Sequence, residues 1–318
     1  MDFWNRLDAV MKAHPESWRI HIGAHKTATT HVQDILALRR DVLASQGIDC
    51  PTRETLRRVR FAKQVRARLM FFKLRTYWPF RQLSQWYDLR RIRSAEHLPT
   101  LLISEEDLLG LSNGLISHIL YPNAEERMRH LRNLVKGGPT TLFLSIRNPA
   151  NIIPSAYSQC LRAGARGIPN ITEICQSTLA NPPSWTDLVR RIRKGFPEAR
   201  LVVWTFEDYI ANPDAYLDLL VGKPLGDWPS VETPTSTRGM SAEAIDRIQA
   251  LDRSLSRHEH IKRCAQLAAE DTGRTRFQPF STEEIADITR TYEKDLAELE
   301  REFPGVLQRL PREHSPQP

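Results

Sequence analysis

Four short apolar runs, each ending beside a glycine or polar residues, constrain the fold of this chain more than any other feature. They cover residues 18–23, 98–104, 140–146 and 200–206. Each is rich in leucine or β-branched residues, and helical segments separate one run from the next. Strands that are apolar almost throughout are typical of a parallel sheet covered by helices on both faces. The pattern therefore predicts an α/β fold with a P-loop-like parallel sheet, in which ligands bind outside the carboxyl ends of the strands.

The last third of the chain is predicted to be helical. Ser281 and Glu284 form a capping box before a helix of about twenty residues that runs toward Phe303. Ser241 is placed to cap an earlier helix. No Gly/Ser-rich linker divides the chain, so we expect one domain over residues 1–310, followed by a flexible tail over residues 311–318.

Composition narrows the class of protein further. The 318 residues are 41% hydrophobic and 26% charged, which excludes collagen, low-complexity disorder and a disulfide scaffold. The four cysteines are far apart and form no CxxC pair, so a reducing compartment suits them. The longest apolar runs are too short to cross a bilayer, and the first twenty residues contain no signal-peptide core. We therefore expect a cytoplasmic protein.

The net charge of +7 is concentrated in one segment. Residues 53–93 hold 13 Lys or Arg and two acidic residues, a local charge of +11, while the rest of the chain carries −4. Aromatic residues are interleaved with these bases, and we expect a basic helical insertion at about residues 53–97. Such a segment is a solvated face over the core, or it binds an anionic acceptor substrate, an acidic membrane surface or a nucleic acid. We expect no specific nucleic acid.

The loop after the first apolar run, GAHKTATTH over residues 23–31, is the first candidate site. Lys26 can reach anionic oxygens, and the amides of residues 27–30 open a helix N-terminus, which favours negative charge. The loop is not a Walker A motif, because His25 stands where that motif has glycine directly before the lysine. An ordinary strand-to-helix turn is the alternative interpretation.

A second candidate element follows the third apolar run. Arg147 closes that run, and Ser155 lies eight residues later in a helical segment. The donor fork of an arginine and the hydroxyl of a serine can converge on one phosphate. Taken separately, the two residues would be a surface arginine and a helix-cap serine.

Together these segments resemble the sulfotransferase family that uses 3′-phosphoadenosine 5′-phosphosulfate (PAPS). RIHIGAHKTATT, residues 19–30, is similar to the loop of that family that binds the 5′-phosphosulfate. LFLSIRNPANIIPSAY, residues 142–157, is similar to the 3′-phosphate motif. WTFEDYIANPDAYLDLLVG, residues 204–222, is similar to a family strand that ends in an aromatic-Glu-Asp run.

The resemblance implies a role for each matching residue. Lys26 would bind the bridging oxygen and the leaving 5′-phosphate. Phe206 would pack on adenine, and Arg238 would cover the 3′-phosphate held by Arg147 and Ser155. The 5′-phosphosulfate would be surrounded by the other loop residues, His25, Thr27, Ala28, Thr29 and Thr30. Ala28 departs from the glycine that is common in the family, and it would be strained if its φ is positive.

The resemblance also places a catalytic base at the end of the second apolar run, where Glu105, Glu106 and Asp107 follow one another. Many bacterial relatives align their glutamate with Glu106. Glu105 and Asp107 are otherwise helix-capping acids, and His25 is a second candidate for touching the acceptor. The implied reaction moves a sulfuryl group from PAPS to a hydroxyl or amine, releases 3′-phosphoadenosine 5′-phosphate (PAP), and needs no metal.

Two other classes of function remain open at this point. One is a P-loop nucleotide kinase or ATPase with a degenerate loop, and the other is a non-enzymatic protein that binds a nucleic acid or a membrane surface through the basic segment. The acceptor is not identified by the sequence. If it lies in a membrane, the protein would act peripherally at the inner membrane surface.

Overall fold

The described residues build a five-stranded parallel sheet in the order β2-β3-β1-β4-β5. The computed structural model describes residues 14–58, 92–93, 98–135, 138–231, 239–252, 254–273 and 275–310. The strands are β1 (Ser17–Gly23), β2 (Ile48–Asp49), β3 (Thr100–Ser104), β4 (Thr140–Ile146) and β5 (Arg200–Thr205). The chain leaves β1 for strands on either side of it, so the carboxyl end of β1 is the point where ligands bind in open α/β sheets.

Both faces of the sheet are buried, as the apolar runs predicted. In β1, Ile20 and Ile22 belong to one buried cluster. In β4, Leu142 and Leu144 join that cluster, whereas Phe143 belongs to the cluster on the opposite face. Because successive side chains of a strand point to opposite faces, this alternation lets a central strand be apolar throughout.

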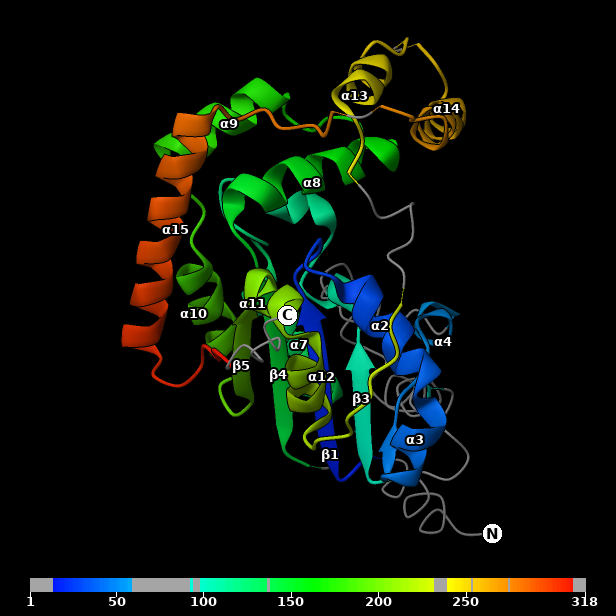
Figure 1. Ribbon diagram of the computed structural model, residues 1–318, viewed down its shortest axis with the longest axis vertical. Helices are drawn as coiled ribbons and strands as arrows, with labels where there is room; N and C mark the ends of the chain where they lie inside the picture. Colours follow the sequence, from blue (N-terminus) through cyan, green and yellow to red (C-terminus); the bar gives the residue numbers. More distant parts are fainter. Residues whose placement is uncertain are drawn as a thin grey trace, which may run out of the picture.

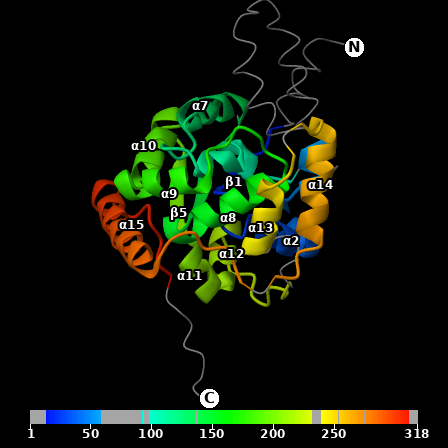
Figure 2. The same ribbon diagram turned by 90° about the horizontal axis from the view of Figure 1, so that it is seen from above.

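Helices cover each face (Figures 1 and 2). On one side lie α7 (Ala124–Leu134) and α10 (Trp185–Gly195), and on the other lie α2 (Thr29–Leu38) and α12 (Pro213–Val221). Figure 1 shows α8 (Pro149–Arg162) beyond the carboxyl ends of the strands. The other helices of the described residues are α3 (Arg40–Ser45), α4 (Arg53–Arg58), α9 (Ile171–Ala180), α11 (Phe206–Ala211), α13 (Ala242–Gln249), α14 (Arg257–Ala269) and α15 (Thr282–Glu302), with the 3-10 turns η1 (Glu106–Leu108) and η2 (Ser112–Leu115).

The C-terminal helices confirm the start signals found in the sequence. The Ser281 side chain accepts a hydrogen bond from the Glu284 amide, and the Glu284 carboxylate accepts one in return from the Ser281 amide. The Ser241 hydroxyl caps α13 by accepting from the Ala244 amide. The predicted α/β sheet with a helical C-terminal third is therefore confirmed.

The structure differs from the predictions at the end of the fourth apolar run and at β2. The fourth apolar run ends at Thr205 rather than at Phe206, which is the first residue of α11. The Thr205 hydroxyl accepts from the Asp208 amide, and this cap begins the helix one residue early. The strand β2 was not predicted at all.

Most of the predicted basic insertion, the predicted tail at 311–318 and Arg238 lie outside the described residues. The short helix α4 and residues 92–93 are the described parts of the segment 53–97. Among the described helices, none is both long and apolar enough to cross a membrane.

Candidate functional site

The backbone of the loop after β1 has the geometry of an anion-binding nest. Lys26 and Ala28 both have positive φ angles, 64° and 66°, with one residue between them. Ala28 is also the N-cap residue of α2, and no side chain caps that helix. Alternating left-handed residues turn successive amides to one side, and an uncapped helix N-terminus adds partial positive charge. The predicted strand, loop and helix are all present.

The strain that the sequence predicted at position 28 is therefore real. A left-handed residue with a Cβ costs about 1–2 kcal/mol, and glycine avoids that cost but loses more freedom on folding. We expect Ala28→Gly to stabilise the fold by about 0.5–1 kcal/mol and to raise the melting temperature by about 1–3 °C. Thermal unfolding followed by circular dichroism measures this.

The matched control is Ala163→Gly, in an exposed residue at the C-cap of α8 with φ −75°. There the alanine is unstrained, so the same substitution should destabilise the protein. If both variants lost stability equally, the positive φ of Ala28 would not be a source of strain.

The loop threonines are used in part to hold the loop itself. The hydroxyls of Thr27 and Thr29 both donate to the Ala24 carbonyl oxygen, at 2.6 and 3.2 Å. Thr30 is half-buried, and among the described residues its side chain forms no hydrogen bond with another residue of the site. These contacts stabilise the turn on which the nest depends.

Lys26, Arg147 and Phe206 come together, although they lie far apart in the sequence. Arg147 donates from Nη1 to the Lys26 carbonyl oxygen at 2.9 Å. Its guanidinium carbon lies 4.2 Å from the centre of the Phe206 ring, a cation–π distance. The Arg147 Nε is buried and has no hydrogen-bond partner among the described residues. A buried donor of this kind is satisfied when an anion binds.

Two further arginines belong to this cluster. Burial and the charges of Arg162, Arg147 and Arg276 lower the pKa of Lys26 to about 8. Burial and Arg276 likewise lower the pKa of Arg147 to about 10. The charges that shift the Lys26 pKa in the described part of the chain are thus all cationic. We call Lys26, Arg147, Arg162 and Arg276 the cation cluster.

The turn that carries Arg147 is fixed from three sides. The indole Nε1 of Trp185, at the start of α10, donates to the Arg147 carbonyl oxygen at 3.1 Å. The Asn148 amide donates to Glu207 of α11, and the Asn148 side chain donates to the Thr289 hydroxyl of α15. Helices from the last half of the chain therefore position an arginine at the end of β4.

Ser155 is held less directly. It lies in the second turn of α8, the helix that starts immediately after this turn, and it is buried. No described hydrogen bond joins it to Arg147. Its place on α8 agrees with the sequence prediction, and its role toward a phosphate stays a prediction.

The acidic residues after β3 have distinct surroundings. Glu105 is buried, its amide donates to the His21 carbonyl oxygen, and its side chain caps η1 by accepting from the Asp107 amide. Burial, with the charges of Glu106 and Asp107 nearby, raises the pKa of Glu105 to about 7. This carboxyl therefore serves the local backbone.

Glu106 lies directly against the start of the loop after β1, residues 23–31, which we call the nest loop. A Cβ atom built on Gly23 would lie 2.8 Å from the Glu106 Cβ, so the glycine makes room for this side chain. Gly23 also has a φ of 82°. Glu106 is half-buried and accepts a hydrogen bond from Gln33 of α2 at 3.2 Å. It is thus the acid of the three that lies against Gly23, at the start of the loop.

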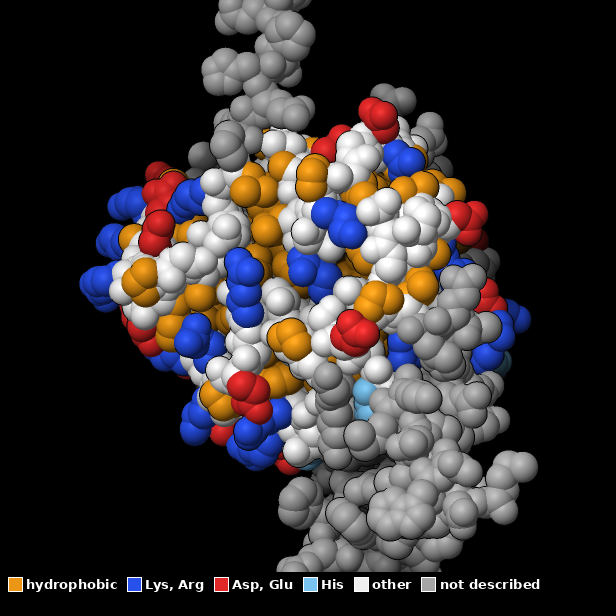
Figure 3. All heavy atoms as spheres, turned by 90° about the horizontal axis from the view of Figure 1, so that it is seen from below, with side chains coloured by type: hydrophobic (Ala, Val, Ile, Leu, Met, Phe, Trp, Pro, Cys, Tyr) orange, Lys and Arg blue, Asp and Glu red, His pale blue; other side chains and the backbone are white. Residues whose placement is uncertain are grey.

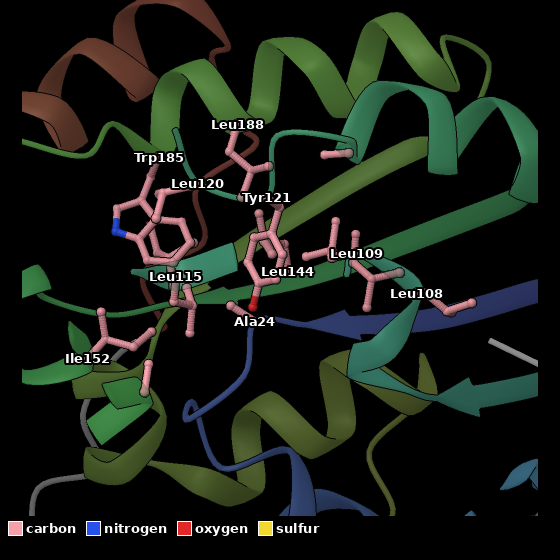
Figure 4. Close-up of a cluster of buried hydrophobic side chains, with 14 of the residues drawn as sticks. Ala24, Leu108, Leu109, Leu115, Leu120, Tyr121, Leu144, Ile152, Trp185 and Leu188 are labelled. Atoms are coloured by element: carbon pink, nitrogen blue, oxygen red, sulfur yellow. The ribbon is translucent and has the colours of Figure 1, made fainter. Parts of the chain in front are cut away.

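His25 anchors the loop from inside. Its Nε2 lies 3.1 Å from Asp107 Oδ1, and its Nδ1 lies 2.9 Å from the Tyr121 hydroxyl, which also accepts from the His25 amide. A carboxylate only accepts hydrogen bonds, so Nε2 donates to Asp107, while Nδ1 is hydrogen-bonded to the Tyr121 hydroxyl. Figure 4 shows Tyr121 within the buried hydrophobic cluster, with its oxygen directed toward Ala24. Both ring nitrogens are therefore engaged, which favours an anchoring role over contact with the acceptor.

No family model and no curated protein matches this chain. Among solved structures, it is similar to a sulfotransferase from Alicyclobacillus acidocaldarius, with 12% sequence identity, a TM-score of 0.45, and coverage of 91% of this chain and 95% of that one.

Proposed function

We propose that the chain is a sulfotransferase that moves a sulfuryl group from PAPS to a hydroxyl or amine of an acceptor. The observation that carries the proposal is the cation cluster beside the nest loop at the carboxyl end of β1. PAPS carries anionic groups at both its 5′ and 3′ positions. The nest with Lys26 would bind one of these groups, and the arginines of the cation cluster would bind the other.

The residues fit the donor in three parts. The 5′-phosphosulfate would lie on the amides of residues 27–30 with Lys26. The 3′-phosphate would lie between Arg147 and Ser155. We add Arg276, whose charge acts on both Lys26 and Arg147, and Arg162, whose charge acts on Lys26. Phe206 would offer its ring to adenine.

The proposed reaction consists of an attack on sulfur, a proton transfer to the protein and the cleavage of one bond. The oxygen or nitrogen of the acceptor attacks sulfur and gives its proton to Glu106. The bond between sulfur and the 5′-phosphate oxygen breaks, and the electron pair stays on that oxygen beside Lys26. No step in this scheme uses a metal ion.

The acceptor is proposed to be anionic or to lie at a membrane surface. This rests on the charge of +11 over residues 53–93, most of which lie outside the described residues. On the face in Figure 3, by comparison, basic and acidic side chains are interspersed with hydrophobic ones. A field concentrated in one segment attracts anionic partners, and salt screens that attraction.

Binding of the desulfated product tests the proposal directly. PAP at about 100 times its Kd should stabilise the protein by about 2.7 kcal/mol and raise the melting temperature by several degrees. AMP lacks the 3′-phosphate and should have a much smaller effect. Thermal shift in the presence of EDTA measures both. Equal stabilisation by PAP and AMP would count against the assignment.

A further inference from the structure

Gln33 is a buried polar residue that the proposed mechanism does not yet use. It lies in α2 and is 7% exposed. Its Nε2 donates to the Ser104 carbonyl oxygen at 2.9 Å and to Glu106 Oε2 at 3.2 Å. A side-chain amide has two protons, so both are committed to these acceptors. One of them is the carboxylate assigned as general base.

The orientation of the Gln33 amide is fixed by these partners. If the amide were flipped, its oxygen would face a carbonyl oxygen and a carboxylate, and no hydrogen bond would form. In the observed orientation Oε1 is buried and has no hydrogen-bond partner among the described residues. Leaving a buried acceptor unpaired costs about 1–3 kcal/mol. The observed orientation is less favourable by this free energy, but it keeps the hydrogen bond from Nε2 to the Glu106 carboxylate.

Glu106 is thereby held from two sides. Gly23 leaves space for its Cβ, and Gln33 holds its carboxylate. Gln33 and Ser104 also line a small pocket with Cys50, Thr52 and Arg53. A general base must stay aligned with the acceptor, and a misplacement of about 1 Å can cost about 100-fold in rate.

We propose that Gln33 is a positioning residue that holds the Glu106 carboxylate in place for proton removal from the acceptor. The inference rests on the proposed sulfotransferase function. Gln33 does not touch the donor in this scheme, so its loss should change turnover and leave donor binding intact. A purely structural residue would change both together.

The test is kinetic and uses PAPS with water as the acceptor, measured as release of labelled sulfate. Gln33→Met keeps the length of the side chain and removes both hydrogen bonds. We expect the turnover number to fall between about tenfold and 100-fold. The KM for PAPS and the thermal shift with PAP should stay within about twofold of wild type. Gln33→Asn, which is too short to reach both acceptors, should show a smaller loss in the same direction and replaces Gln33→Met if that variant does not fold.

Gln249→Met is the matched control. Gln249 donates from Nε2 to the Tyr157 hydroxyl at 2.7 Å, away from Glu106, so the same substitution there should leave turnover unchanged. Wild-type turnover in Gln33→Met, or a loss of PAP binding that parallels the loss of turnover, would overturn the inference while the sulfotransferase assignment stands. A wild-type protein that neither binds PAP nor releases sulfate would overturn the proposed function, and this inference with it.

A second measurement does not depend on turnover. In protein labelled with 15N-glutamine, the side-chain amide signals of Gln33 are assigned by their absence from Gln33→Met. These signals should move when Glu106 is replaced by glutamine, because one of the two protons loses its carboxylate partner. Unchanged signals would overturn the inference even if the kinetics agreed.

Discussion

Arg147→Ala should weaken PAP binding by about 10- to 100-fold and remove the preference for PAP over AMP. Hydrogen bonds to charged groups are worth about 1.5–3 kcal/mol, and the guanidinium lies beside the nest with its buried Nε unpaired among the described residues. AMP has no 3′-phosphate, so its weaker binding should change little. Isothermal titration of both nucleotides measures the change in selectivity.

Two variants make this result specific. Arg147→Lys keeps a positive charge but loses the donor fork, and it should lose most of the selectivity. Arg132→Ala removes an exposed arginine that pairs with Glu198 on the surface, and it should bind PAP as wild type does. If Arg147→Ala still preferred PAP over AMP, the 3′-phosphate would have to lie elsewhere.

The pH dependence of PAP binding follows from the same cluster. Lys26 has a pKa of about 8 in the free protein, so at pH 7 it is mostly charged and at pH 9 mostly neutral. Binding of an anion favours the charged form, which means that PAP affinity should fall as the pH rises through 8. The fall should be absent in Lys26→Met, because that side chain does not titrate.

The parts of the fold that the sequence predicted are those set by local patterns. The four apolar runs form strands because their successive residues are apolar and can be buried on both faces of a sheet. Ser281 and Glu284 mark the start of α15 because a capping box needs only four neighbouring residues. β2 was not predicted, because its two residues, Ile48 and Asp49, are too few to show a hydrophobic period.

The candidate site was predictable where local motifs carry it, which are the loop at residues 23–31 and the ends of the apolar runs at Arg147 and Phe206. Lys26 and the strain at Ala28 could be inferred from the strand-loop-helix pattern. Arg276 and Gln33 could not, because each acts on a residue that lies far from it in the sequence. Tyr121 similarly reaches His25 across 96 positions. Such contacts depend on how helices pack, and no local pattern encodes them.

The acidic triplet shows the same limit. The sequence places Glu105, Glu106 and Asp107 together, but which of them lies against Gly23 is decided by the turn after β3. That turn directs Glu105 to the backbone of η1 and Asp107 to His25, and it leaves Glu106 against Gly23. The assignment of the base therefore depends on the fold as well as on the resemblance.

Glu106→Gln should reduce turnover by about 100-fold or more, since general-base catalysis contributes about 10²–10⁴-fold. The amide has the shape of the carboxylate but cannot take the proton of the acceptor, so PAP binding should stay within about twofold of wild type. The matched control is Glu105→Gln, because an amide oxygen can still accept from the Asp107 amide and cap η1. Release of labelled sulfate from PAPS, measured for both variants, separates the two glutamates. If Glu105→Gln were inactive and Glu106→Gln active, the proton would have to pass to the buried carboxyl, whose pKa of about 7 would suit a base.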